Sequence, residues 1–271
     1  MHQVSNMLVI DQNESYKDNG PFTYVGQELF NNYDLVTDFV DPIEELRMTH
    51  NNLTNQTLYI LSHSPSFSNL KVIDLRENKI DSLEVMMINL HKIHLPALKE
   101  LYIDVKTKED DNHTDVTFMF TGILEFTRNL DVLWLKNTSK VFLVRPDDPE
   151  KLMNPMPFKR LYLSNFNFAD NCSINFIKSL TKVEKLSLEK CRIEVPLLEK
   201  EDPYANCINI KSLSLTHCTG NFKFSFYSKS LFNRLTELSL TKLDFIKDLK
   251  FLTKFKHLKK LRIARLKLAS D

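Results

Sequence analysis

Four side chains that could bind a metal ion fall within a short part of the sequence, and they are Cys191, Cys207, His217 and Cys218. Zinc prefers thiolate and imidazole ligands, and its paired ligands are usually separated by about two to four residues. The one close pair here is His217 and Cys218, and adjacent residues of a strand point to opposite faces. We therefore predict no metal site, and we expect Cys191 and Cys218 to be small buried residues.

The sequence also lacks the common catalytic and nucleotide-binding motifs. Its four glycines are Gly20, Gly26, Gly122 and Gly220, and no two of them fit the spacing of a phosphate-binding or dinucleotide-binding loop. Neither G-x-S-x-G nor H-E-x-x-H occurs. We predict a protein that is not an enzyme and that needs no cofactor.

Three aromatic residues have the types and the spacing of a protein-binding site. Tyr102, Trp134 and Tyr162 each stand between two aliphatic residues, and Trp134 is the single tryptophan of the chain. Tyr and Trp lose little rotamer entropy on binding and offer a large contact area with a polar tip. Such side chains can act together if the fold places them side by side.

A repeated segment would place them in that way. The stretch LKVIDLRENKI, residues 70–80, has the form L-x-x-L-x-L-x-x-N-x-L with Ile for Leu at two places. Related stretches begin at residues 43, 70, 98, 130, 158, 183, 210, 235 and 258, which gives steps of 27, 28, 32, 28, 25, 27, 25 and 23 residues. With this consensus and period, the chain resembles the leucine-rich repeat superfamily. One repeat cannot bury its own apolar face, so the repeats must stack.

The resemblance implies an α/β fold, a curved leucine-rich repeat solenoid. A parallel β-sheet would line its concave face, and helices and irregular loops would cover its convex face. We expect about nine repeats in residues 43–271. Residues 21–42 would form an N-terminal cap or a degenerate repeat, and residues 1–20 a mobile N-terminal segment.

The position after the strand holds Asn51 and Asn78 in early repeats and Cys191 and Cys218 in later ones. Cysteine at that position, with periods of 25–28 residues, is similar to the irregular cysteine-containing repeats of F-box proteins. In that family the repeats bind a ubiquitination substrate, and an F-box helix bundle recruits the ligase. No F-box is evident in residues 1–42. The resemblance therefore implies, as an alternative function, the substrate-recognition subunit of an SCF-type ubiquitin ligase.

On the concave face, one outward residue per strand would form a column across the sheet. Its members are Arg47, Asp74, Tyr102, Trp134, Tyr162, Ser187, Ser214, Ser239 and Arg262. We predict a scaffold that binds a partner protein there, centred on the three aromatic residues, with Asp74 and Arg76 turned outward beside Tyr102 and with Arg47 and Arg160 close by. Alternatively, the rings stabilise the sheet as cross-strand pairs.

Charge is distributed along the length of the chain. Residues 1–50 hold nine acids and two bases, a formal −7, whereas residues 241–271 hold ten bases and three acids, a formal +7. The last strand carries a possible basic patch of Lys259, Lys260, Arg262 and Arg265. This end could contact nucleic acid, a less favoured function, or the cations could prevent edge-to-edge pairing where the chain leaves no room for a cap.

The composition is that of a folded protein, with 42% hydrophobic and 26% charged residues and a net charge of +1. No secretory signal or membrane-spanning run is visible, and the four cysteines lack C-x-x-C spacing. We expect a cytoplasmic or nuclear protein that does not act at a membrane.

Overall fold

The computed structural model describes residues 7–9, 44–51, 68–78, 80, 95–105, 129–138, 142–144, 155–168, 176–194, 207, 209–221, 233–246 and 249–266. The chain divides into two compact units. The first unit comprises Met1–Glu109 and Gly122–Ser139, and the second comprises Asp110–Thr121 and Lys140–Asp271.

The described residues of the first unit form five parallel strands in sequence order. They are β1 (Met7–Val9), β2 (Glu45–Arg47), β3 (Val72–Leu75), β4 (Glu100–Val105) and β5 (Val132–Asn137). Strand β1 pairs with β2 in parallel, so this sheet begins one strand before the first consensus repeat. Apart from β1, residues 1–42 lie outside the described residues, and their assignment to a mobile segment and a cap stays a prediction.

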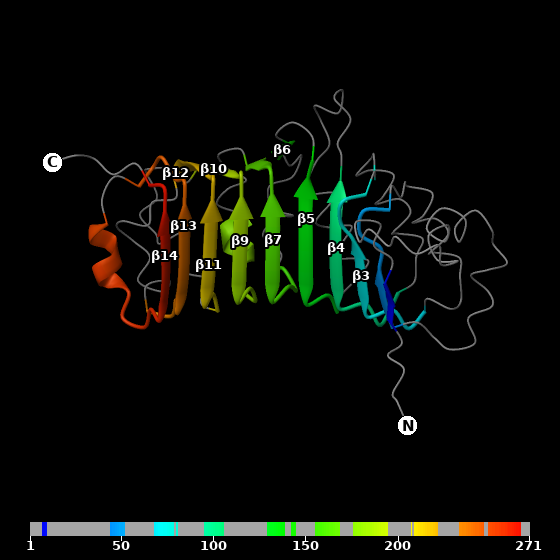
Figure 1. The fold of residues 1–271 in the computed structure, drawn as a ribbon. Coiled ribbons are helices and arrows are strands. Elements are labelled where there is room, and N and C mark those ends of the chain that lie inside the picture. The colour runs from blue at the N-terminus through cyan, green and yellow to red at the C-terminus, as the bar shows by residue number, and fades with distance from the viewer. Residues whose placement is uncertain are drawn as a thin grey trace, which may run out of the picture. The chain divides into compact units, whose positions relative to one another are not determined.

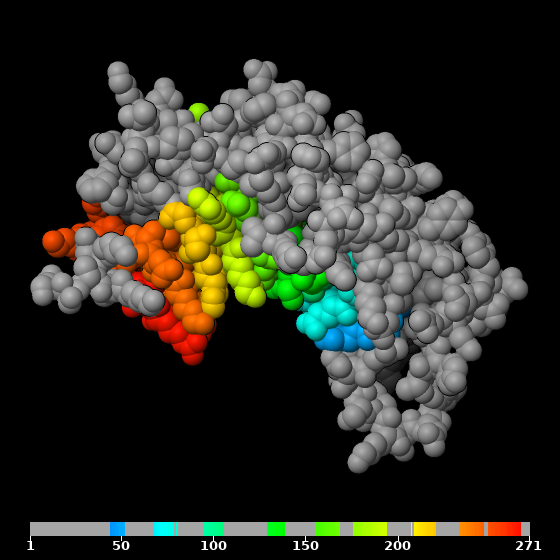
Figure 2. Space-filling view, turned by 90° about the horizontal axis from the view of Figure 1, so that it is seen from above, coloured from blue at the N-terminus to red at the C-terminus, as the bar shows by residue number. Residues whose placement is uncertain are grey.

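In the part of the second unit that the structure describes, five further parallel strands lie side by side (Figure 1). They are β7 (Arg160–Ser164), β9 (Lys185–Glu189), β11 (Ser212–Thr216), β13 (Glu237–Thr241) and β14 (Lys260–Ala264). In the space-filling view these coils follow one another as bands from green at β7 to red at β14 (Figure 2). Each coil is one repeat of the sequence pattern.

A second, shorter parallel sheet follows the turns of the second unit. Its strands are β6 (Phe142–Val144), β8 (Phe166–Phe168), β10 (Arg192–Glu194) and β12 (Thr219–Asn221), in the order β12-β10-β8-β6. The repeat pattern did not predict this sheet. Of the helices expected on the return path, the described residues show a helical turn at 176–179 and a 3-10 helix, η3, at Lys250–Lys254.

Alternation of buried and more exposed residues along β9, β11 and β13 separates the core from the surface. In β11, Leu213 and Leu215 are buried, whereas Ser212, Ser214 and Thr216 are half-exposed. Successive side chains of a strand point to opposite faces, so the ladder leucines of neighbouring coils meet on one side. The core of the second unit also includes fully buried Phe158, Phe166, Phe168 and Phe176.

Several coils have a turn residue in the left-handed backbone conformation after the strand. This residue directly precedes the consensus Asn/Cys position, and it is His50, Glu77, Asn165, Lys190, His217, Lys242 or Arg265, with φ between 50° and 68°. In this conformation the backbone N–H of the turn residue points toward the following coil. Asn165, Lys190 and His217 donate to a carbonyl of the following coil at 2.8, 2.8 and 2.9 Å. The ladder of hydrogen bonds therefore continues past the ends of β7, β9 and β11.

The residue at the consensus Asn/Cys position bonds in the opposite direction, to the preceding coil. The Asn78 amide nitrogen donates to the carbonyls of Met48, Leu75 and Arg76 at 2.7, 2.9 and 3.2 Å, and its oxygen accepts the amide N–H of Asn51 at 2.9 Å. An asparagine here thus ties two coils together.

Cysteine replaces asparagine in this role in later coils. The Cys218 thiol donates to the Leu188 carbonyl at 3.3 Å, 30 residues back, and to Thr216 at 3.6 Å. Cys191 makes the equivalent bond to Leu163 at 3.5 Å. Burial raises the pKa of the Cys218 thiol to about 11 and raises that of Cys191 further, so both are protonated weak donors. The prediction that both cysteines are buried is confirmed.

We expect Asn78→Ala to lower the free energy of unfolding by about 2–3 kcal/mol, because it leaves several backbone groups of two coils without their partner. Asn129→Ala is the matched control, since the exposed Asn129 amide makes a long contact of 3.5 Å to the Pro96 carbonyl. Denaturant titration followed by circular dichroism measures both. Equal losses for the two variants would contradict a linking role for Asn78.

Candidate functional site

The main sheet has an outer face, which we define as the face opposite its buried leucine ladder. In the first unit one outer column reads Arg47, Asp74, Tyr102 and Trp134 in direct register. In the second unit the corresponding column reads Tyr162, Ser187, Ser214, Ser239 and Arg262. The sequence therefore predicted the register of these residues correctly within each unit.

The prediction that Asp74 turns outward to solvent is wrong, because Asp74 is only 2% exposed. The Arg76 guanidinium binds it with two parallel hydrogen bonds, from Nε to Oδ1 at 2.9 Å and from Nη2 to Oδ2 at 2.7 Å. A second guanidinium, that of Arg47, approaches Oδ2 at 3.7 Å. A buried carboxylate needs such compensation, and the bidentate pair supplies it.

Arg76 also lies against the two aromatic rings of the first unit. Its guanidinium carbon is 5.2 Å from the ring centroid of Tyr102 and 5.2 Å from that of Trp134, within cation–π range. The hydrogen bonds to Asp74 raise the pKa of Arg76. We call Asp74, Arg76, Tyr102 and Trp134 the arginine–aromatic cluster. Its rings are half-buried, and its guanidinium is held in place from two sides.

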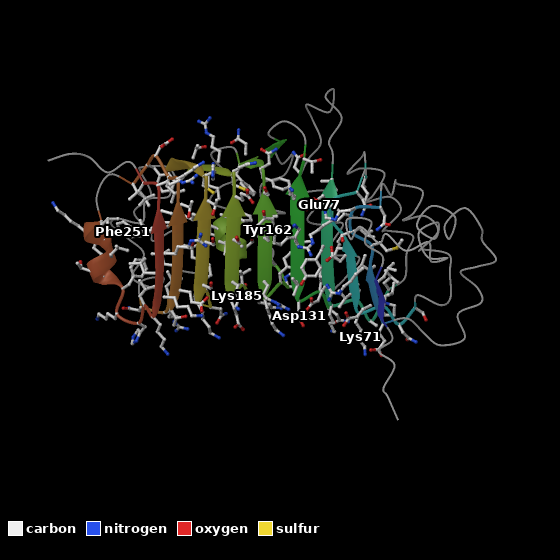
Figure 3. All side chains as sticks on the ribbon, in the orientation of Figure 1. Lys71, Glu77, Asp131, Tyr162, Lys185 and Phe251 are labelled. Carbon is white, nitrogen blue, oxygen red and sulfur yellow. The ribbon has the colours of Figure 1, made fainter. Side chains whose placement is uncertain are left out.

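The other predicted site residues lie around this cluster or in the second unit. Tyr102 donates its hydroxyl proton to Glu100 Oε2 at 2.8 Å, and Arg47 is paired with Glu45 at 3.2 Å. Tyr162 and Arg160 are on β7 of the second unit, where the Tyr162 hydroxyl donates to Glu189 and Arg160 is exposed. Figure 3 shows Tyr162 midway along β7 and Lys185 at the start of β9.

Sequence reasoning missed Asp104, which lies two residues after Tyr102 on the outer face and is 2% exposed. Its Oδ2 accepts the Glu77 amide N–H at 3.2 Å, and the Lys136 ammonium is 3.6 Å away. Among the described residues, no hydrogen-bond donor reaches Oδ1. Burial raises the pKa of Asp104, and this effect outweighs the opposing one of Lys136. The sequence did carry a signal for this residue, because an acid two positions after Tyr102 in a strand lies on the same face of the sheet.

The four cations of the predicted basic patch, Lys259, Lys260, Arg262 and Arg265, are all exposed. Lys260 forms an ion pair with Glu237 at 2.7 Å. The ladder residues of β14 are exposed as well, Leu261 by 48% and Ile263 by 36%, whereas their counterparts in β13 are buried. Binding by the basic patch stays a prediction.

The strand register can be compared with the repeated stretches of the sequence. The consensus stretches recur at steps of 23 to 32 residues, and within each unit their ladder positions pair one-to-one across neighbouring parallel strands. The coils thus have the sequence period and the strand register that the leucine-rich repeat interpretation predicts. No family model matches the sequence, and no curated protein matches it. The solved structure of a TLR13–ssRNA13 complex aligns at 15% identity with a TM-score of 0.44, and the alignment covers 85% of this chain and 37% of that chain.

This chain therefore spans well under half the length of the TLR13 chain, and the repeat assignment rests on register and sequence rather than on that likeness. Within the described ranges, no three His, Cys, Asp or Glu side chains form a group that could hold a metal ion. In the described part of the chain, no helix is long and apolar enough to cross a membrane.

We expect the buried Asp104 to make stability depend on pH with a definite sign. Its pKa is raised above the ordinary value of 3.8, so the folded state retains the proton over a range of pH in which the unfolded state has released it. The stability gained from neutral Asp104 is full at low pH and is lost as the pH rises from about 3.8 through the folded pKa. The Asp104→Asn variant lacks this pH-dependent contribution to stability.

Glu237→Gln is the control of opposite sign. The hydrogen bond from Lys260 lowers the pKa of Glu237 below its ordinary value of 4.5. The contribution of Glu237 to stability is therefore present above pH 4.5 and is lost as the pH falls through the folded pKa. Denaturant titrations at a series of pH values measure both differences from the wild type. The stability difference between the wild type and Asp104→Asn should fall as the pH rises. A difference that stays constant or grows with pH would contradict the environment assigned to Asp104.

Proposed function

We propose that the chain is a non-enzymatic scaffold that binds a partner protein on the outer face of the repeats, the concave face of a horseshoe. The site would be centred on Tyr102 and Trp134 in the first unit, and Tyr162 stays a predicted site residue of the second unit. The observation that carries this proposal is the arginine–aromatic cluster. It presents half-buried Tyr, Trp and Arg side chains, the three types enriched at interface hot spots.

The cluster is also preorganised. Asp74 holds Arg76 with two hydrogen bonds, and the guanidinium rests against both rings. A partner would therefore lose little side-chain entropy on this side of the interface. The cross-strand alternative is compatible with this role, since paired rings that stiffen the sheet also keep a fixed shape for a ligand.

The two other functions considered stay predictions without a specific supporting observation. The ligase-adaptor role would require a docking segment, and residues 1–42 lie outside the described residues except for β1. The nucleic-acid role would use the exposed cations around β14, one of which is already paired with Glu237. Localisation in cytoplasm or nucleus is likewise a prediction.

We expect Trp134→Ala and Tyr102→Ala each to weaken binding of the cognate partner by about 2 kcal/mol or more, as is usual for central aromatic residues. The partner is first identified by pull-down and mass spectrometry, and its affinity for each purified variant is then measured by calorimetry. Ser214→Ala, in the same column of the second unit, is the matched control and should change affinity little. Unchanged affinity of both aromatic variants for every identified partner would refute the proposal.

A further inference from the structure

The outer face of the first unit contains two buried carboxylates, those of Asp74 and Asp104. An arginine side chain binds the first with two hydrogen bonds, and no such pair is seen for the second among the described residues. Asp74 on β3 is bound bidentately by Arg76, whose guanidinium also lies against two rings. Asp104 on the next strand is equally buried, at 2% exposure, and shares the outer face with Tyr102 and Trp134. No arginine of the described residues is hydrogen-bonded to it.

Asp104 is incompletely satisfied by its present neighbours. One oxygen, Oδ2, receives a single backbone hydrogen bond from Glu77, and Lys136 remains at 3.6 Å, beyond hydrogen-bond length. The other oxygen, Oδ1, has no donor within the described ranges. A buried carboxylate oxygen without a donor is costly, so this side chain gains most from a ligand that supplies N–H groups.

The surroundings define the chemistry of that ligand. Outward positions of β2–β5 carry four carboxylates, Glu45, Asp74, Glu100 and Asp104. They face three cations, Arg47 on β2, Lys136 on β5 and Arg76 directly after β3. Trp134 lies diagonally across from Asp104 in the register, a separation that an aromatic side chain can span. A planar guanidinium can donate to both carboxylate oxygens and stack on an indole, whereas an ammonium cannot do both.

We propose that Asp104 and Trp134 bind an arginine side chain of the partner protein. The guanidinium donates to both oxygens of Asp104 and rests against the Trp134 ring, repeating what Arg76 does with Asp74. Lys136 has to move aside, and its half-exposed ammonium can do so because it makes no short bond to Asp104. This assignment rests on the proposed function and names the chemistry that the partner must present.

The single tryptophan makes this site directly observable, since all indole fluorescence of the protein comes from Trp134. The probe is the peptide acetyl-Gly-Arg-Gly-amide, and its matched control is the same peptide with citrulline, which has the shape of arginine without the charge. We expect the arginine peptide to change the fluorescence saturably and to release or take up heat in calorimetry. The citrulline peptide should bind at least about tenfold more weakly.

Two substitutions should act in opposite directions, which separates recognition from loss of folding. Asp104→Asn keeps an acceptor for the Glu77 amide, and it should weaken binding of the arginine peptide by about tenfold or more. Lys136→Ala removes the competing cation and should strengthen binding. Lys185→Ala, an exposed cation on β9 of the second unit, is the control and should have no effect. Circular dichroism confirms that each variant is folded.

The assignment is overturned if neither fluorescence nor calorimetry distinguishes the arginine peptide from the citrulline peptide. It is also overturned if Asp104→Asn binds as well as the wild type, or if Lys136→Ala does not bind more tightly. If the natural partner loses affinity for Tyr102→Ala but not for Asp104→Asn, the scaffold function stands and the arginine assignment fails. If the arginine peptide binds as expected but no partner depends on Tyr102 or Trp134, the proposed function fails instead.

Discussion

Every part of this structure depends on the pairing of each coil with the next. A short parallel strand cannot satisfy its own backbone groups, and its leucines cannot be covered by its own coil. The left-handed turn residue extends this pairing beyond the strand, since its amide reaches forward to the next coil. The consensus Asn or Cys side chain reaches back to the previous one. Together they fix the height of one coil above another and prevent a slip in register.

Fixed register gives the outer face its properties. Because residues at equivalent positions become direct neighbours, substitutions along one column build a continuous surface without affecting the core. In the first unit the outer column forms a compact network. Asp74 orients Arg76, and Arg76 lies against Tyr102 and Trp134. In the second unit the same column holds three serines between Tyr162 and Arg262. The two faces therefore suit different contacts.

The sequence predicted what the repeat period controls. The ladder leucines, the parallel register and the burial of Cys191 and Cys218 all follow from equivalent positions in equivalent coils, and all are confirmed. The outcome for Asp74 was not predictable in this way. Arg47 on β2 and Arg76 directly after β3 contact its carboxylate, and no consensus position encodes that geometry.

Asp104 and the second sheet were missed for related reasons. Strand β4 runs to Val105 without the left-handed residue, so the Asp104 side chain, rather than its carbonyl, accepts the Glu77 amide. The replacement of a carbonyl acceptor by a side-chain acceptor depends on where the strand ends. The repeat period does not define the end of a strand well. The second sheet consists of three-residue strands, such as Phe166–Phe168, that are too short to carry a pattern of their own. Both features depend on contacts between coils rather than on the residues of one repeat.

The stacking account is tested most directly by hydrogen exchange at the turn amides of Asn165, Lys190 and His217. These amides lie outside the main strands and donate to the next coil at 2.8, 2.8 and 2.9 Å. If the turns extend the ladder, the three amides should be protected to the same degree as strand amides such as that of Leu188, because they open only when the coils separate. Rapid exchange at these turns, with the strand amides still protected, would contradict the account.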